Sequence, residues 1–326
     1  MHDAGFPVFD LGAFLSADAG SRRAMGEEVD AICRETGFLA IQNHGVPQRV
    51  IDDIRCVTAA FFALPEPDKQ SAAAPRPGYP YGWLGPLKEA LAKSRNEDTP
   101  PDLKESFNGG PQSAPQGLAD PDALAFCYAP TIWPDRPDGF REAWTAYYHE
   151  MESLAARIMR LFAAALRLPD DWFEPYIDRP ISALRALHYP AQRIAPEPGQ
   201  QRAGAHTDYG SLTILLPQSG SRGLEIFSPK GEWVEVPPVD DAFIVNIGDL
   251  MALWTNDRWV STLHRVVNPR DGQHNVARQS LAFFHQPNWD ARIEAIPGCL
   301  NEKEPARHAP VLSGPYLMGK FRATTM

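Results

Sequence analysis

Hydrophobic positions recur at helical spacing in three stretches of the chain. Residues 21–34 and 48–64 each combine an apolar stripe with charged positions, and Pro65 ends the second stretch. Residues 140–166 give the clearest pattern, with aromatic and aliphatic side chains at steps of three and four. We therefore expect three helices, the last of them a scaffold helix whose aromatic face belongs to the core.

After residue 181 the pattern changes to short β-type runs that Gly, Pro, Asn and Asp separate. No helical pattern lies between these runs, and no glycine-rich phosphate loop follows one, which argues against a parallel dinucleotide-binding sheet. Many short strands at regular spacing are typical of a sandwich or barrel. Two further strands are expected near the N-terminus. The expected strands are 6–11, 37–47, 182–189, 212–216, 224–227, 233–236, 243–247, 259–267 and 280–285.

The segment 65–137 differs in composition from the rest of the chain, because 14 of the 32 prolines fall in it. Only short regular pieces are expected there, such as residues 84–93. Its aromatic side chains favour burial, so the segment is expected to be an ordered loop. Such a loop serves either as a lid or substrate wall, or as irregular packing without a role in substrate choice.

These patterns divide the chain into four parts, which together form one compact catalytic unit. Residues 1–137 form an N-terminal α/β region with proline-rich loops that packs on the core, and 138–180 carry the scaffold helix. Residues 181–296 form the β core. The tail, 297–326, is expected to fold back over the body.

The composition limits the classes of binding partner and the cellular compartment that we expect for the protein. The 326 residues are 44% hydrophobic and 22% charged, as in ordinary globular proteins. A net charge of −10 without any Lys/Arg-rich block argues against nucleic acids and membrane surfaces as partners. No signal peptide or long apolar run is evident. The four cysteines are scattered without a C-x-x-C pair, which favours free thiols in the cytoplasm. The oligomeric state is not readable from the sequence.

The candidate metal ligands are two histidines and one aspartate in strand-like segments. His206 and Asp208 are two residues apart, so on an extended segment their side chains point to the same side. His264 lies in a later β-type run and can supply a third ligand. Two imidazoles and one carboxylate with open positions make up the facial triad of non-haem Fe(II) oxygenases.

A candidate anion site follows the second histidine. Arg278 and Ser280 share one face of their strand, and a guanidinium beside a hydroxyl is a good receptor for a carboxylate. The far carboxylate of 2-oxoglutarate would fit such a receptor. Tyr189, at the end of another strand, could donate to the same group if it faces inward, although a core tyrosine is an equal alternative.

The same alternation suggests a substrate pocket. Arg185 and Leu187 share the face of Tyr189, and Phe284 shares the face of Arg278. An inward Arg185 without an obvious acidic partner would suit an anionic substrate, and Phe284 would form an apolar wall. Against this, a solvated strand arginine is the commoner case. The adjacent pair Lys104–Glu105 is interpreted either as a salt-bridged pair at the pocket rim or as a substrate contact.

Taken together, these residues resemble the signature of the isopenicillin N synthase-like family of Fe(II)/2-oxoglutarate-dependent oxygenases. The resemblance implies a mainly β fold with flanking helices around a double-stranded β-helix, or jelly roll. It implies that His206, Asp208 and His264 bind iron and that Arg278 and Ser280 bind 2-oxoglutarate. Supporting segments that resemble the family are 43–47, 104–107, 223–225, 244–249 and 254–256.

One position departs from the family pattern. Many members have Asn-x-Tyr where this chain has Leu187-His188-Tyr189, so only Tyr189 can be carried over. Members that work without 2-oxoglutarate also carry Arg-x-Ser, so this motif leaves the cosubstrate open.

We therefore expect an Fe(II)-dependent dioxygenase that uses 2-oxoglutarate and O2 as cosubstrates. It would oxidise a C–H bond of a small molecule and release succinate and CO2, with hydroxylation as the expected outcome and desaturation or cyclisation as alternatives. The chemistry would be carried by the iron centre, and no separate side-chain acid or base is assigned. Two other functions stay open: an Fe(II)-dependent oxidase of the cyclising or ethylene-forming type that needs no 2-oxoglutarate, and a non-redox metal-binding jelly-roll protein.

Overall fold

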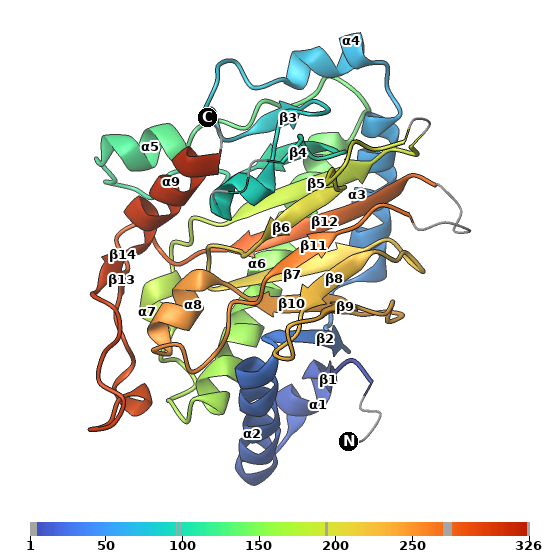
Figure 1. Ribbon diagram of the computed structural model, residues 1–326. Helices are drawn as coiled ribbons and strands as arrows, with labels where there is room; N and C mark the ends of the chain where they lie inside the picture. Colours follow the sequence, from blue (N-terminus) through green and yellow to red (C-terminus); the bar gives the residue numbers. More distant parts are fainter. Residues whose placement is uncertain (1–4, 96, 98, 193–194, 270–275, 325–326) are drawn as a thin grey trace.

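The computed structural model of the chain describes residues 5–95, 97, 99–192, 195–269 and 276–324. Within these residues, eight strands form a main sheet and four form a smaller sheet in front of it (Figure 1). The main sheet has the order β1 (Val8–Asp10), β2 (Phe38–Gln42), β10 (Phe243–Ile247), β7 (Leu212–Pro217), β12 (Arg278–His285), β5 (Ala183–Tyr189), β4 (Glu105–Gly109), β3 (Gly82–Leu84). The smaller sheet has the order β6 (Ala203–His206), β11 (His264–Val266), β8 (Leu224–Phe227), β9 (Trp233–Glu235).

Side-chain alternation along the central strands produces two cores. Leu184 and Phe283 point to the side where helix α6 packs against β7 and β12, and they join the larger hydrophobic cluster. Leu187 and Ala282 point to the other side and join a smaller cluster that contains residues from both sheets. The two sheets therefore enclose an interior of their own, which is the jelly-roll arrangement that the family resemblance implied.

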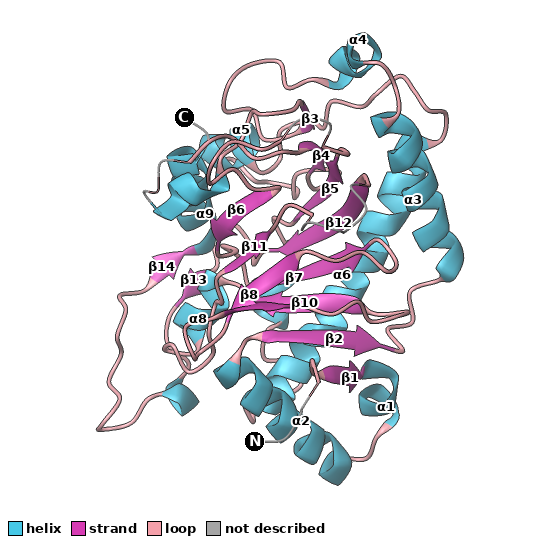
Figure 2. Ribbon diagram, turned by 45° about the vertical axis from the view of Figure 1, so that its right-hand side comes forward, coloured by secondary structure: helices cyan, strands magenta, loops and turns pink. Residues whose placement is uncertain are grey.

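Helices cover the outer face of the main sheet (Figure 2). The three predicted helices are confirmed, and α6 contacts both α2 and α3. Their bounds are α2 (Ala19–Glu35), α3 (Gln48–Phe62) and α6 (Phe140–Ala165). The shorter elements are α1 (Leu11–Ser16), α4 (Glu66–Lys69), η1 (Gln70–Ala72), η2 (Leu91–Arg95), α5 (Pro121–Phe126), α7 (Glu174–Ile177), α8 (Asp249–Trp254), β13 (Arg292–Ile293), η3 (Pro297–Cys299), β14 (Val311–Leu312) and α9 (Ser313–Thr324).

The structure corrects two predicted elements. The regular piece expected at 84–93 is limited to its two ends: β3 ends at Leu84, and the 3-10 turn η2 begins only at Leu91. The strand expected at 259–267 is limited to β11. The first half of the expected strand packs on helices instead. The Trp259 indole donates a hydrogen bond to Asp30 in α2 at 2.8 Å and contacts the Phe162 ring in α6 in an edge-to-face geometry.

The tail folds back over the body, as predicted, but it does so as a helix. Helix α9 contacts η2, and its Phe321 ring lies 5.0 Å from Phe126 in α5. Its Lys320 ammonium binds the Asp249 carboxylate at 3.1 Å, and Tyr316 donates to the same carboxylate at 3.3 Å. These contacts attach α9 to the edge of the two-sheet interior. Every helix in the described residues is too short or too polar to cross a bilayer.

Gly210 and Gly248 lie where two chain segments pass in close contact just after Asp208. A Cβ added at Gly248 would lie 2.2 Å from the Gly210 carbonyl oxygen, although the backbone φ of −100° is ordinary. We expect Gly248→Ala to lower the free energy of unfolding by about 1–3 kcal/mol, because backbone must shift to admit the methyl group. Urea unfolding would measure it. Gly298→Ala is the matched control, since its Cβ would meet nothing within 4 Å, and an equal effect of both variants would contradict the prediction.

Candidate active site

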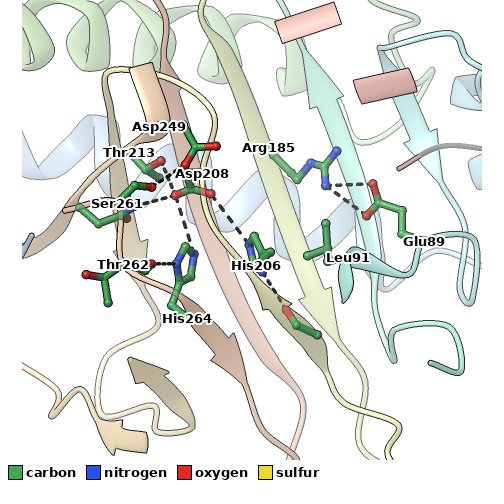
Figure 3. A network of polar contacts seen from close by, with 12 residues as sticks. Glu89, Leu91, Arg185, His206, Asp208, Thr213, Asp249, Ser261, Thr262 and His264 are labelled. Atoms are coloured by element: carbon green, nitrogen blue, oxygen red, sulfur yellow. Dashed lines mark hydrogen bonds and ion pairs between the residues drawn. The ribbon is translucent and has the colours of Figure 1, made fainter. Parts of the chain in front are cut away.

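Three predicted ligands meet on the wall of the cavity between the two sheets. His206 ends β6, His264 begins β11, and the two are direct partners in an antiparallel pair. Asp208 follows on the same segment as His206. Their potential ligand atoms all lie within 4.8 Å of one another, and the two imidazole rings are 4.4 Å apart (Figure 3). Two strands and one following loop thus bring together the residues that the sequence singled out.

Backbone carbonyls set the orientation of both imidazoles. His206 Nδ1 lies 2.8 Å from the Gly204 oxygen, and His264 Nδ1 lies 3.1 Å from the Thr262 oxygen. These carbonyls accept an Nδ1–H hydrogen bond, which leaves each Nε2 with a free lone pair. The Nε2 atoms face the Asp208 carboxylate at 3.9 Å and 3.8 Å. Both rings therefore present the tautomer that a metal requires.

The Asp208 carboxylate is held by two side chains that sequence reasoning missed. Thr213 Oγ1 donates to Oδ2 at 2.6 Å, and Asn246 Nδ2 donates to the same oxygen at 2.7 Å. Thr213 and Asn246 are direct partners across β7 and β10. Because both bonds use Oδ2, the other oxygen stays available as a ligand.

The protonation states suit a divalent metal. Burial, followed by the neighbouring His264, lowers the pKa of His206 to about 3, so this imidazole is neutral. Burial raises the pKa of Asp208, but the two histidines and the bonds from Thr213 and Asn246 outweigh it and leave this pKa below its ordinary value. Two imidazole nitrogens and one carboxylate oxygen form a donor set that fits Fe(II).

Removing the Thr213 hydroxyl tests the support of the carboxylate. We expect Thr213→Val to weaken divalent-metal binding by about 10–100-fold, the usual effect of losing an outer partner of a ligand. Thr213→Ser keeps the hydroxyl and should retain nearly the parent affinity. Anaerobic titration with Mn(II) or Fe(II) would measure both variants, and unchanged affinity in Thr213→Val would show that this hydrogen bond does not orient the ligand.

The predicted anion site lies farther along the same sheet face. Arg278 is paired with Tyr189, and Ser280 with Leu187, across β12 and β5. The Arg278 guanidinium is buried at 4% exposure and lies 5.1 Å from the Tyr189 ring centre. Its Nε is 3.4 Å from the Ser221 hydroxyl, whereas its Nη1 is buried and has no hydrogen-bond partner within the described part of the chain. A buried cation with a vacant N–H fits a carboxylate.

A second arginine near this site was missed. Arg202, directly before β6, is 5% exposed, and its Nη2 donates to the Val276 carbonyl at 2.8 Å. Burial and the neighbouring Arg278 lower the pKa of Arg202, and burial likewise lowers that of Arg278. The two guanidiniums make this end of the interior strongly attractive to an anion.

The predicted substrate residues line the same cavity, but one premise about them is wrong. Arg185, Leu187 and Phe284 all border a cavity of about 200 Å³ that also contains the ligand cluster and Arg278. Arg185 has an acidic partner: its Nη1 donates to both oxygens of Glu89, at 3.0 Å and 3.1 Å (Figure 3). Glu89 comes from the irregular segment before η2, where sequence patterns give no strand register.

Lys104 and Glu105 do not pair with each other, because strand alternation sends them to opposite faces. Lys104 binds Asp102 at 2.8 Å and Glu89 at 3.3 Å on the cavity side. Glu105 binds Lys69 at 2.8 Å and His188 at 2.9 Å. Of the two alternatives for this pair, the salt-bridged one is therefore wrong.

The proline-rich segment and the tail complete the cavity wall. The segment contributes Tyr81, Asn108 and Phe126, and α9 contributes Leu317 and Phe321. Of the two interpretations of the segment 65–137, the structure thus supports a wall of the cavity. The signal that could have found this was its content of aromatic side chains.

Comparisons with known proteins agree with this geometry. Residues 180–287 match the model of the 2OG-Fe(II) oxygenase superfamily, and residues 6–136 match that of the non-haem dioxygenase in morphine synthesis N-terminal region. The 2-oxoglutarate-Fe(II) type oxidoreductase hxnY of Emericella nidulans is 31% identical, over 97% of this chain and 89% of that protein. The proline hydroxylase buaE of Petromyces alliaceus is 34% identical over 92% of each.

Among solved structures, a full-length Neurospora crassa protein in complex with alpha-KG and thymine has a TM-score of 0.85. It is 29% identical, and the match covers 99% of this chain and 98% of that chain. The similarity therefore extends over nearly the whole chain, including the N-terminal region and the tail.

Proposed function

Because this chain belongs to the 2OG-Fe(II) oxygenase superfamily, we propose that His206, Asp208 and His264 bind its Fe(II) and that Arg278 binds its 2-oxoglutarate. The enzyme is an Fe(II)- and 2-oxoglutarate-dependent dioxygenase that oxidises a small molecule at a C–H bond and releases succinate and CO2. The relatives favour this function over a 2-oxoglutarate-independent oxidase and over a non-redox metal-binding protein.

The observation that carries the proposed roles is the common sheet face. Arg278, Ser280, Ala282 and Phe284 follow one another at alternate positions of β12, so a strand rise of about 3.4 Å per residue separates Arg278 from Phe284 by roughly 20 Å. The ligand cluster lies near the Phe284 end, because Thr213, which holds Asp208, is the partner of Phe284. The extended Arg278 side chain and a five-carbon dicarboxylate bound to it would together bridge this separation.

Each of the chain's side chains then has a limited task. Arg278 would form a charge-assisted bond to the distal carboxylate of 2-oxoglutarate, with hydrogen bonds from Ser280 and Tyr189. Fe(II), when bound, supplies the activation of dioxygen that oxidation of a C–H bond requires. The apolar lining, including Leu187 and Phe284, would exclude water and keep the substrate next to the metal.

We propose Arg185, Leu187 and Phe284 as substrate contacts. The charge of Arg185 is already balanced by Glu89, whose pKa is lowered to about 2: burial opposes this shift, and Arg185 and Lys104 outweigh it. The pocket therefore offers no free cation at Arg185 for an anionic substrate.

We also propose that the enzyme acts in the cytoplasm. The four cysteines are all free, with Cys56 exposed on α3, and exposed free thiols are usual in a reducing compartment.

The proposed function is tested with purified protein under anaerobic conditions. Addition of Fe(II) and then 2-oxoglutarate should produce a weak visible absorption band, and admission of O2 should convert 2-oxoglutarate to succinate. Iron binding without a band would favour the 2-oxoglutarate-independent oxidase. Absence of iron binding would refute the assignment of the three ligands.

A further inference from the structure

We propose, on the basis of the function above, that the substrate is a neutral, flat ring compound that carries N–H donors beside carbonyl acceptors, as cyclic imides and lactams do. Asn108 and Gln286 would accept hydrogen bonds from its N–H groups, and Arg185 would donate to a carbonyl.

Two buried amide oxygens lack a donor at the substrate end of the cavity. Asn108 is 7% exposed and Gln286 is 3% exposed, and both line the cavity. The Asn108 Oδ1 and Gln286 Oε1 atoms have no hydrogen-bond partner among the residues that the structure describes. The Asn108 Nδ2 faces the Gly82 carbonyl in a long contact of 3.5 Å. Buried acceptors without donors are rare and unfavourable, so a ligand that brings donors to them is strongly preferred.

Strand register places one of these acceptors beside a donor. Asn108 in β4 and Arg185 in β5 are direct partners, so their side chains emerge side by side on the cavity face. Among the described residues, only Nη1 of Arg185 has hydrogen-bond partners, namely the two Glu89 oxygens. The guanidinium is thereby fixed in place, and its remaining N–H groups are available to a carbonyl. An adjacent donor and acceptor match the N–H and C=O edge of an imide or lactam.

The charge at this wall favours a neutral ligand. Arg185 and Lys104 are balanced by Glu89 and Asp102, through contacts of 2.8–3.3 Å. A carboxylate placed against Arg185 would also approach the Glu89 carboxylate, and like charges in a buried site repel strongly.

The remaining lining favours a flat and small ring. Phe284, Tyr81 and Phe126 are among the residues that border the cavity, and its volume of about 200 Å³ is shared with the cosubstrate site. Aromatic side chains pack best against flat rings. A polyol would bring donors but no flat face to pack against these rings.

A matched pair of probes tests the donor requirement. Thymine carries two N–H groups, whereas 1,3-dimethylthymine has the same ring and carbonyls with neither donor; benzoate provides an anion and myo-inositol a polyol. Binding is measured anaerobically, as the change that each probe causes in the visible band of the Fe(II)–2-oxoglutarate protein. The band without any probe must form first, so its absence reports failure of the proposed function and not of the substrate class.

We expect thymine to bind at least about 100-fold more tightly than 1,3-dimethylthymine, because a site built for hydrogen bonds rejects ligands that leave its groups unpaired. Thymine should also bind more tightly than benzoate or myo-inositol. Equal or tighter binding of any of these three, or no detectable binding of thymine at millimolar concentration, would overturn the proposal.

Two variants separate recognition from structural damage. Asn108→Leu and Gln286→Leu should each reduce the preference for thymine over its dimethyl derivative by about tenfold or more, since each removes an acceptor. Neither should lower the melting temperature of the free protein, because each removes an unpaired buried oxygen. An unchanged preference in both variants would contradict the assignment, and an unchanged 2-oxoglutarate band would verify that the metal site is intact.

Discussion

Asp208→Ala should be folded but unable to form succinate from 2-oxoglutarate. Asp208 is the single anionic group among the three proposed ligands and is 6% exposed. Loss of an outer partner alone weakens metal binding by about 10–100-fold, so loss of the carboxylate itself should have a larger effect. The variant should also lack the visible band that 2-oxoglutarate adds to the anaerobic Fe(II) protein. Both measurements use the same sample, since band and turnover depend on one site.

The control is a carboxylate far from the cavity. Asp53 lies on α3 with its side chain 55% exposed and faces Arg49 at 3.6 Å, so Asp53→Ala should keep both the band and the turnover. Circular dichroism and thermal unfolding would verify that the Asp208 variant is folded. A band of parent intensity in Asp208→Ala would exclude Asp208 as a ligand of the iron.

The placement of His206, Asp208 and His264 could be predicted because it depends on strand alternation and short spacing. Two residues on an extended segment share a side, and the chain needed only to bring β11 beside β6. The inward direction of Arg278 and Ser280 followed from the same rule. In contrast, the hydrogen bonds from Thr213 and Asn246 to Asp208 depend on the register between β7 and β10. These strands lie about 30 positions apart in the sequence, and no local pattern encodes their register.

The roles of residues that lie in irregular segments could not be predicted. Glu89 reaches Arg185 from a stretch without regular structure, where neither parity nor helical spacing gives a direction. Helix α9 was missed because Gly314, Pro315 and Gly319 lower its helix propensity. Tertiary contacts stabilise it instead, among them the bond from Lys320 to Asp249. Asp249 in turn donates its backbone N–H to the Asp208 carbonyl at 2.8 Å, so the tail is connected to the ligand loop.

Arg278→Gln should have the second-largest effect on activity. This effect should fall on the affinity for 2-oxoglutarate and leave the metal site unchanged. Arg278→Gln removes a buried charge opposite the proposed carboxylate of 2-oxoglutarate. Truncating one partner of such a pair costs about 2–5 kcal/mol, so the KM for 2-oxoglutarate should rise by roughly 30-fold or more. Fe(II) affinity in the absence of 2-oxoglutarate should stay at the parent value. Titration of the anaerobic band gives the binding constant directly.

Ser280→Ala is the graded comparison, because it removes one neutral hydrogen bond from the same receptor. Its expected cost of about 0.5–1.5 kcal/mol corresponds to a change of roughly 2–12-fold in the affinity for 2-oxoglutarate. We expect Arg278→Gln to reduce the affinity for 2-oxoglutarate far more than Ser280→Ala does. The reason is charge, because the Arg278 guanidinium is a buried cation with an N–H group that lacks a partner within the described protein. Equal small effects of both variants on the KM for 2-oxoglutarate would mean that the cosubstrate carboxylate lies elsewhere in the cavity, with Arg202 as the next cation to test.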